Sequence, residues 1–128
     1  MTTTSAHVPI IKQLAPLKKP IFVEKPFSST YQEAKEGWDE LDKYQTQCFV
    51  GFQRRLDKNI KAIYDRTRGK EIKAVRAYHC DNPSASIEYY SRAGPQALDQ
   101  GIHELDLISW MREGELPEEV FAYGFNTM

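Results

Sequence analysis

The stretch Ile21–Pro26, with the sequence IFVEKP, places three apolar residues directly before a glutamate, a lysine and a proline. A short apolar run that ends at a proline predicts a buried β-strand. Lys25 would stand at the carboxyl end of this strand, where open α/β sheets bind their ligands. Lysine is rarely buried without a partner. We therefore expect Lys25 to contact a ligand; the alternative is a surface ion pair with Glu24, which would contribute little to stability.

The segments on both sides of this strand have helical spacing. Apolar residues predict a helix over residues 8–15, opened by Pro9 in its first turn. After the strand, Ser29 and Gln32 have the spacing of a capping box, and an amphipathic helix follows them. The strand is thus flanked by two helices, as in an α/β layer.

A second apolar strand is predicted over residues 47–52, QCFVGF. It is continuous rather than alternating, which is typical of strands buried on both faces of a parallel sheet. Asp57 is the expected N-cap of a third helix and Gly69 its expected end. The order helix, strand, helix, strand, helix predicts a parallel α/β layer up to about residue 68.

The pattern changes after Gly69. Residues 71–80 alternate between two unlike faces, which predicts a strand, and residues 118–126 predict another. Between them, residues 96–112 have the strongest helical periodicity in the chain. The second part therefore has the pattern of a β-α-β unit of antiparallel character, with a boundary between the two parts near residues 67–72.

Composition limits the partners of this chain. Its 128 residues suffice for one core, and 17 basic against 18 acidic residues give a net charge of -1. This balance provides no field that would attract nucleic acid or an anionic membrane. The longest apolar runs are far shorter than the roughly 18 residues that a membrane helix needs. Cys48 and Cys80 are isolated, so we expect reduced thiols in a cytoplasmic protein rather than a disulfide framework.

Asp99 and His103 are four residues apart in the helix predicted over residues 96–112. This spacing places both side chains on one face, where the carboxylate could hold the imidazole tautomer and raise its proton affinity for general acid-base chemistry. The alternative is structural, because the helix dipole favours any acid in the first turn. His7 and His79 could add ligands for zinc, but no metal-motif spacing supports a metal site.

Polar residues also follow the second strand. Arg54 could neutralise an anionic group of a ligand, and Gln53 could hydrogen-bond a hydroxyl. Arg55 is better explained as a solvated residue that opens the next helix. His7 lies before the first helix, where a ligand contact and a plain N-terminal cap region are equally consistent with the sequence.

Three stretches of the chain together resemble successive landmarks of one family, the Gfo/Idh/MocA oxidoreductases, which include inositol 2-dehydrogenase and glucose–fructose oxidoreductase. The stretches are TTTSAHVPIIKQLAPLKKPIFVEKP, VGFQRRLDKNIKAI and ALDQGIHELDLISWM. They occur in the family's order and extend over nearly the whole chain. The most specific features are the EKP triplet after a strand and the D-x-x-x-H pair in the GIHELDL helix.

The resemblance implies a fold class, α/β, and a division into two domains. Residues 1–68 would form the C-terminal half of a Rossmann-type parallel sheet, part of a dinucleotide-binding domain. Residues 69–128 would form the first β-α-β part of an α/β domain with an open, mainly antiparallel sheet, which binds substrate and builds an oligomer interface. We expect a homo-oligomer, or pairing with full-length subunits, through that sheet.

The resemblance also implies a reaction, hydride transfer between NAD or NADP and a secondary alcohol of a polyol or sugar. The catalytic residues would be Lys25, Asp99 and His103: His103 would take the hydroxyl proton, Asp99 would orient the substrate and Lys25 would stabilise the alkoxide. Pro26 is expected to follow a cis peptide bond that aims Lys25 into the cleft. The cofactor would contact Thr4, Ser5, His7, Glu24, Lys25 and Gln53. The substrate would contact Lys25, Arg54, Asn82, Asp99 and His103.

The chain departs from the family at the phosphate fingerprint G-x-G-x-x-G, which needs two glycines separated by one residue. The glycines stand at positions 37, 51, 69, 94, 101, 114 and 124, and no pair has that spacing. We therefore expect a fragment that lacks on the order of 70 residues of the Rossmann domain, and the end of the second domain, and has little activity alone. The alternative is a non-catalytic truncated homologue that serves as an interaction module for full-length subunits. The choice between NAD and NADP stays open, because the residue that selects between them would lie in the absent segment.

Overall fold

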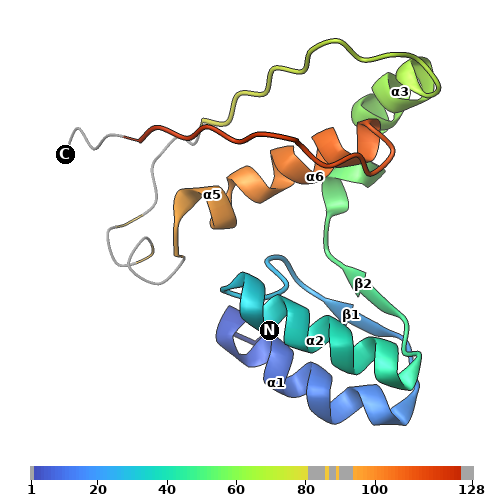
Figure 1. Cartoon of the computed structure of the whole chain (residues 1–128), viewed down its shortest axis with the longest axis vertical. Helices are drawn as coiled ribbons and strands as arrows, with labels where there is room; N and C mark the ends of the chain where they lie inside the picture. The colour runs from blue at the N-terminus through green and yellow to red at the C-terminus, as the bar shows by residue number, and fades with distance from the viewer. Residues whose placement is uncertain (1, 81–85, 87–88, 90–93, 125–128) are drawn as a thin grey trace.

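The computed structural model describes residues 2–80, 86, 89 and 94–124 of the chain, and Figure 1 shows the arrangement of their elements. The helices are α1 (Thr4–Leu14), α2 (Tyr31–Tyr44), α3 (Lys58–Thr67), α5 (Gln96–Asp99) and α6 (Gly101–Met111), with the 3₁₀ turns η1 (Ala15–Leu17) and η2 (Gln53–Leu56). The strands are β1 (Ile21–Val23) and β2 (Cys48–Val50).

The two strands form a parallel sheet, with Ile21 opposite Cys48 and Val23 opposite Val50. Helices α1 and α2 lie side by side over one face of this sheet (Figure 1). The core between these layers consists of Val8, Ile11, Ala15, Val23, Phe27 and Leu41. The predicted parallel α/β layer of the first part is confirmed.

The other face of the sheet is open to solvent. Phe22 and Phe49 are register partners on this face and are 67% and 59% exposed. The prediction that the second strand is buried on both faces is therefore wrong for the described residues. A continuous apolar run indicates that both faces of a strand can be buried. Burial of the second face also needs another element that packs against it.

Helix α1 begins four residues before the predicted start, at Thr4, and contains Pro9 in its interior. Proline has no backbone N–H, so one hydrogen bond of the helix, the one to the carbonyl of Ser5, cannot form. Apolar periodicity marks only the buried stripe of a helix, which here includes Val8 and Ile11. The polar first turn carries no such signal, which explains the wrong boundary.

Helix α2 is capped one residue later than predicted. The backbone N–H of Glu33 donates to Thr30 Oγ1 at 3.2 Å, and the N–H of Ser29 donates to Glu33 Oε2 at 3.2 Å. These bonds resemble a capping box built on Thr30 and Glu33 rather than on Ser29 and Gln32, except that the Glu33 carboxylate accepts from Ser29, the residue before the N-cap, and not from Thr30. The N-cap of α3 is as predicted, because Asp57 accepts from the N–H groups of Asn59 and Ile60.

The helix predicted over residues 96–112 is divided into two. Helix α5 ends at Asp99, and α6 begins at Gly101 after Gln100, whose φ and ψ are -109° and -53°. Helix α6 lies against α3, where the rings of Tyr64 and Trp110 stack with centroids 3.9 Å apart. The break between α5 and α6 comes directly before Gly101, and glycine destabilises the interior of a helix.

The two strands predicted for the second part are not formed in the described residues. Residues 71–80 and 115–124 contain no hydrogen-bonded strand and run as long extended segments (Figure 1). Alternation of side chains defines two faces, but a strand also needs a neighbour for its backbone groups. The open antiparallel sheet is thus not formed there, and the domain boundary near residue 68 stays a prediction. Within the described ranges, no helix has the length and apolarity to cross a membrane.

Candidate active site

Lys25 follows strand β1 and reaches the second part of the chain. The Lys25–Pro26 peptide bond is cis, as predicted. The ammonium group of Lys25 donates to the backbone carbonyl of Asp99 at 2.5 Å and to its Oδ1 at 3.1 Å. The two side chains are only 20% and 12% exposed, whereas Glu24 is exposed, so the alternative of a surface pair with Glu24 is wrong. An ammonium group has three donors, and these two bonds leave one N–H for a ligand.

Asp99 lies at the end of α5 and is buried. Its Oδ2 accepts from the Tyr89 hydroxyl at 2.7 Å and from Gln100 Nε2 at 3.3 Å. Burial alone would raise the pKa of Asp99, but the hydrogen bonds from Tyr89 and Lys25 outweigh it and lower the pKa below the ordinary value. Asp99 is therefore ionised at neutral pH.

His103 lies in the first turn of α6 and is 5% exposed. Phe52 meets the imidazole edge to face, with ring centroids 6.4 Å apart. In the described part of the chain, His103 Nδ1 is buried and has no hydrogen-bond partner. Such an atom ordinarily costs about 1–3 kcal/mol, so its retention favours a ligand or water at this point.

The protonation of His103 differs from the sequence-based expectation. Burial lowers its pKa, and the positive charges of Arg54 and Lys25 lower it further, while Glu104 and Asp106 act in the opposite direction. No hydrogen bond joins Asp99 and His103 among the described residues, because the helix breaks between them. The expectation that Asp99 raises the proton affinity of His103 is thus wrong; the imidazole is neutral at neutral pH and can accept a proton.

The two arginines after β2 connect to α6 rather than to solvent. Arg54 forms an ion pair with Glu104, and its Nη2 lies 3.4 Å from His79 Nδ1. Arg55 donates to both oxygens of Asp106, at 2.8 and 2.5 Å. Arg55 is therefore not the solvated residue that we expected, since a forked ion pair joins η2 to α6.

Glu104 is the centre of a further small cluster. Its Oε1 lies 3.2 Å from His79 Nδ1, and it also accepts from Arg54. Burial alone would raise the pKa of Glu104, but the hydrogen bonds from His79 and Arg54 outweigh it, so the pKa is lowered. Sequence analysis considered His79 only as a metal ligand; no group of three His, Cys, Asp or Glu residues within the described ranges is arranged to hold a metal.

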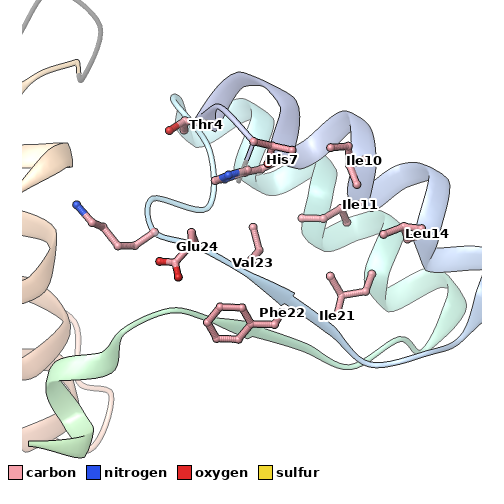
Figure 2. A pocket seen from close by; sticks show the side chains of 11 residues that line it. Thr4, His7, Ile10, Ile11, Leu14, Ile21, Phe22, Val23 and Glu24 are labelled. Atoms are coloured by element: carbon pink, nitrogen blue, oxygen red, sulfur yellow. The ribbon is translucent and has the colours of Figure 1, made fainter. Parts of the chain in front are cut away.

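A pocket of about 490 Å³ lies beside Lys25, between α1 and the exposed edge of β1 (Figure 2). Thr4, His7, Glu24 and Lys25 line it, together with the apolar side chains of both elements. These four are among the six residues predicted to bind the cofactor. Ser5 is exposed and hydrogen-bonds Thr3 instead.

The remaining predicted contacts lie elsewhere. Gln53 is exposed on η2 and does not line this pocket. Asn82 lies outside the described residues. Asp99 and His103 also do not line the pocket, although Lys25 joins the pocket to Asp99 directly.

His7 is held in one orientation at the wall of this pocket. Its Nδ1 lies 3.0 Å from the carbonyl oxygen of Pro26, and the side chain is buried. A carbonyl oxygen can only accept, so Nδ1 must carry the proton. In the neutral imidazole Nε2 is then an acceptor. The sequence placed His7 before the first helix, but His7 lies within α1, whose N-cap is Thr3, so it is not part of a cap region. A ligand contact of His7 stays a prediction.

Comparison with known proteins identifies this architecture. Residues 1–52 match the family model GFO_IDH_MocA, described as an oxidoreductase family with an NAD-binding Rossmann fold. The chain is 32% identical to myo-inositol 2-dehydrogenase of Thermotoga maritima over 96% of its own length and 37% of the relative. It is 34% identical to inositol 2-dehydrogenase/D-chiro-inositol 3-dehydrogenase of Lacticaseibacillus casei, over 92% of this chain and 34% of that one.

A solved structure has the same arrangement. The crystal structure of a "probable dehydrogenase" from Thermotoga maritima superposes on 88% of this chain and 34% of its own with a TM-score of 0.74, at 26% identity. The chain thus spans about a third of the length of the relatives that it matches.

Proposed function

Because this chain belongs to the Gfo/Idh/MocA oxidoreductase family, whose model matches residues 1–52, we propose that it carries the substrate-activating part of a nicotinamide-dependent dehydrogenase. The observation that carries this proposal is the contact between Lys25 and Asp99, 74 residues apart, beside the buried imidazole of His103. We propose a secondary alcohol of a polyol or sugar as the substrate, since the two relatives compared above are inositol dehydrogenases.

The three residues have complementary tasks in this reaction. An alcohol carbon releases hydride only as its hydroxyl loses a proton, so a base must lie within hydrogen-bond reach. His103 is buried and neutral at neutral pH, which suits it to accept that proton. The remaining N–H of Lys25 would donate to the developing alkoxide. Asp99 holds the ammonium group in place through its backbone carbonyl and Oδ1.

The pocket at the end of β1 fits the nicotinamide end of the cofactor, which supplies the hydride acceptor when bound. Thr4 offers a donor there, and His7 Nε2 and the Glu24 carboxylate offer acceptors for ribose hydroxyls. Lys25 also lines the pocket, but its remaining N–H is the one proposed for the alkoxide. No pair of glycines among the seven has the spacing of the phosphate fingerprint. Tight binding of the pyrophosphate would thus need residues other than a glycine-rich loop of these 128.

The substrate pocket would include residues beyond these three. Arg54 and Asn82 are the candidates predicted from the sequence, and Arg54 would act from its ion pair with Glu104. Several hydroxyl groups on a polyol would match such alternating donors and acceptors. Gln53 and Ser5 would contribute to the cofactor side only if the cofactor extends beyond the pocket.

A specific observation also favours a role in protein association. Leu116, Val120 and Phe121 in the extended segment after α6 are 85%, 82% and 91% exposed. Exposed apolar residues of this kind commonly belong to protein interfaces. We propose that residues 69–128 belong to a second domain through which subunits pair, either with copies of this chain or with longer subunits.

The experiment that tests the dehydrogenase proposal measures reduction of NAD or NADP with a panel of polyols. Little turnover is expected from these 128 residues alone, and any turnover with an inositol should fall by a factor of about 10² to 10⁴ in His103→Asn. The same preparation is titrated with nicotinamide mononucleotide and with myo-inositol, observed by NMR. Absence both of turnover and of any binding at Lys25 or His103 would contradict the proposal.

A further inference from the structure

Tyr89 approaches the candidate site from a segment in which sequence analysis found no catalytic residue. Its hydroxyl donates to Asp99 Oδ2 at 2.7 Å, while Lys25 donates to Oδ1 of the same carboxylate at 3.1 Å. The two donors come from segments 64 residues apart in sequence, so the carboxylate is held from two sides. Gln100 makes the third contact, a longer one at 3.3 Å.

We propose that Tyr89 is a positioning residue of the site, which fixes the plane of the Asp99 carboxylate and thereby the direction of the Lys25 ammonium group. The catalytic consequence of this inference rests on the proposed function. The geometry does not rest on the proposed function, because the hydrogen bonds of Tyr89 and Lys25 to Asp99 exist without substrate.

The local backbone does not hold Asp99 in place by itself. Asp99 is the last residue of α5, which has only four residues, and the chain leaves helical hydrogen bonding at Gln100. The terminal torsion of an aspartate is broad, so a single hydrogen bond at Oδ1 would leave the carboxylate free to rotate. A second donor at Oδ2 removes that freedom, and Tyr89 is the closest donor to Oδ2 among the described residues.

The arrangement also assigns the proton acceptor. Both oxygens of Asp99 accept from protein donors, which leaves the carboxylate little capacity to take a proton from substrate. His103 Nδ1 has no hydrogen-bond partner among the described residues, so His103 is the better base. Loss of the Tyr89 hydroxyl would allow Asp99 to turn and would draw Lys25 away from the direction of the substrate.

The test replaces Tyr89 with phenylalanine, which removes the hydroxyl and keeps the ring. We expect kcat in Tyr89→Phe to fall about tenfold with little change in KM, because binding groups are untouched and the alkoxide-stabilising group is misplaced. The matched control is Tyr31→Phe, since Tyr31 lies on α2 and is 81% exposed. The control is expected to retain the wild-type kcat.

A second measurement does not need turnover. Carboxyl ¹³C NMR follows the titration of Asp99 in wild type, Tyr89→Phe and Tyr31→Phe, after circular dichroism has established that each variant is folded. The titratable groups that face this carboxylate are Lys25 and Tyr89, so removal of the Tyr89 hydroxyl should shift the titration of Asp99 to higher pH. If Tyr89→Phe does not fold, the Asp99 titration is followed in Gln100→Ala, which removes the longer of the two hydrogen bonds to Oδ2. Because the Tyr89 bond remains in this variant, Asp99 should titrate near the same pH as in the wild type.

The outcomes separate the two proposals. An unchanged Asp99 titration and an unchanged kcat in Tyr89→Phe would overturn the role of Tyr89 and leave the proposed function standing. A shift of the Asp99 titration in a protein that shows neither turnover with a polyol nor binding of nicotinamide mononucleotide or myo-inositol would support the positioning role and count against the dehydrogenase. A Gln100→Ala variant in which Asp99 titrates at its ordinary pH would also contradict the role of Tyr89.

Discussion

At the scale of single residues, the imidazole of His103 combines burial with neighbouring positive charge. Burial, Arg54 and Lys25 all lower its pKa, so the neutral form persists to more acidic pH than for an ordinary histidine. In the proposed reaction His103 would need no contact with Asp99 to act as the base. Its buried, positively charged surroundings keep the imidazole neutral without a dyad.

This environment predicts the pH dependence of turnover. Since the neutral form of His103 is the active one and its pKa is lowered, kcat/KM should stay constant as the pH falls to about 6.5 and decline only below it. A pH–rate profile of the wild type checks this. An inflection at or above pH 6.5, or the same acidic limb in His103→Asn, would contradict it.

The pair of Lys25 and Asp99 predicts a pH-dependent stability. The pKa of Asp99 in the folded state is lowered, so its contribution is fully present above the unfolded value of about 3.9 and is lost as the pH falls through the folded value. Asp99→Asn should lower the free energy of unfolding by about 1–3 kcal/mol at pH 7. Urea unfolding at pH 7, 5 and 3 measures the free energy of unfolding of the wild type and of Asp99→Asn. The difference between the two proteins should be equal at pH 7 and 5 and smaller at pH 3. A difference that is the same at all three pH values would argue against the ion pair.

At the scale of elements, the catalytic arrangement depends on how η2 and α6 are joined. Arg55 donates two hydrogen bonds to Asp106, whose side chain is 6% exposed, and Arg54 pairs with Glu104 two residues earlier. These bonds hold α6, the helix that contains His103, against η2. They come from two adjacent arginines whose contacts with α6 sequence analysis did not predict: it gave Arg54 to a ligand and Arg55 to solvent.

The forked geometry predicts that lysine cannot replace arginine here. Arg55→Lys should lower the free energy of unfolding by about 1–2 kcal/mol, because an ammonium group cannot make the paired bonds and Asp106 is buried. Guanidinium unfolding measures the difference. Lys35→Met, which breaks an exposed pair with Asp39 on α2, is the control and should leave the midpoint unchanged. Equal midpoints for both variants would contradict the structural role of Arg55.

Local signals predicted several elements well. Asp57 caps α3 as expected, because its carboxylate accepts from the free N–H groups of the first turn. Gly69 has the positive φ of 71° that is common just after the end of a helix. The break at Gln100 was not predictable, since apolar periodicity continues across it. The hydrogen bond of Tyr89 to Asp99 was equally hidden, because no local sequence pattern relates these two residues.

At the scale of the whole molecule, the contacts of the candidate site are also the contacts between its two parts. Lys25 with Asp99, and Arg54 with Glu104, cross from the α/β layer to the helices of the second part. Figure 1 shows that β1 and η2 point toward α5 and α6. Only the family resemblance brought Lys25 together with Asp99 and His103 in advance, because no local pattern relates Lys25 to residues so far away in sequence.

The exposed apolar residues of the second part predict association in solution. Sedimentation velocity should detect species larger than the 14.8 kDa chain, and Phe121→Asp should shift them to the monomer. Leu56→Asp is the control, since Leu56 is 83% exposed but lies in η2, and it should retain the larger species. A monomer in the wild type would contradict this expectation.

The central claim is that the Lys25 ammonium group, fixed by Asp99, assists the loss of a proton and a hydride from an alcohol. The most direct measurement compares NAD or NADP reduction by a polyol in wild type, Lys25→Met and Lys25→Arg, each shown to be folded. We predict that Lys25→Met lowers kcat by a factor of at least about 10² and that Lys25→Arg recovers part of it, because the positive charge is restored in a different geometry. Wild-type turnover in Lys25→Met would contradict the account.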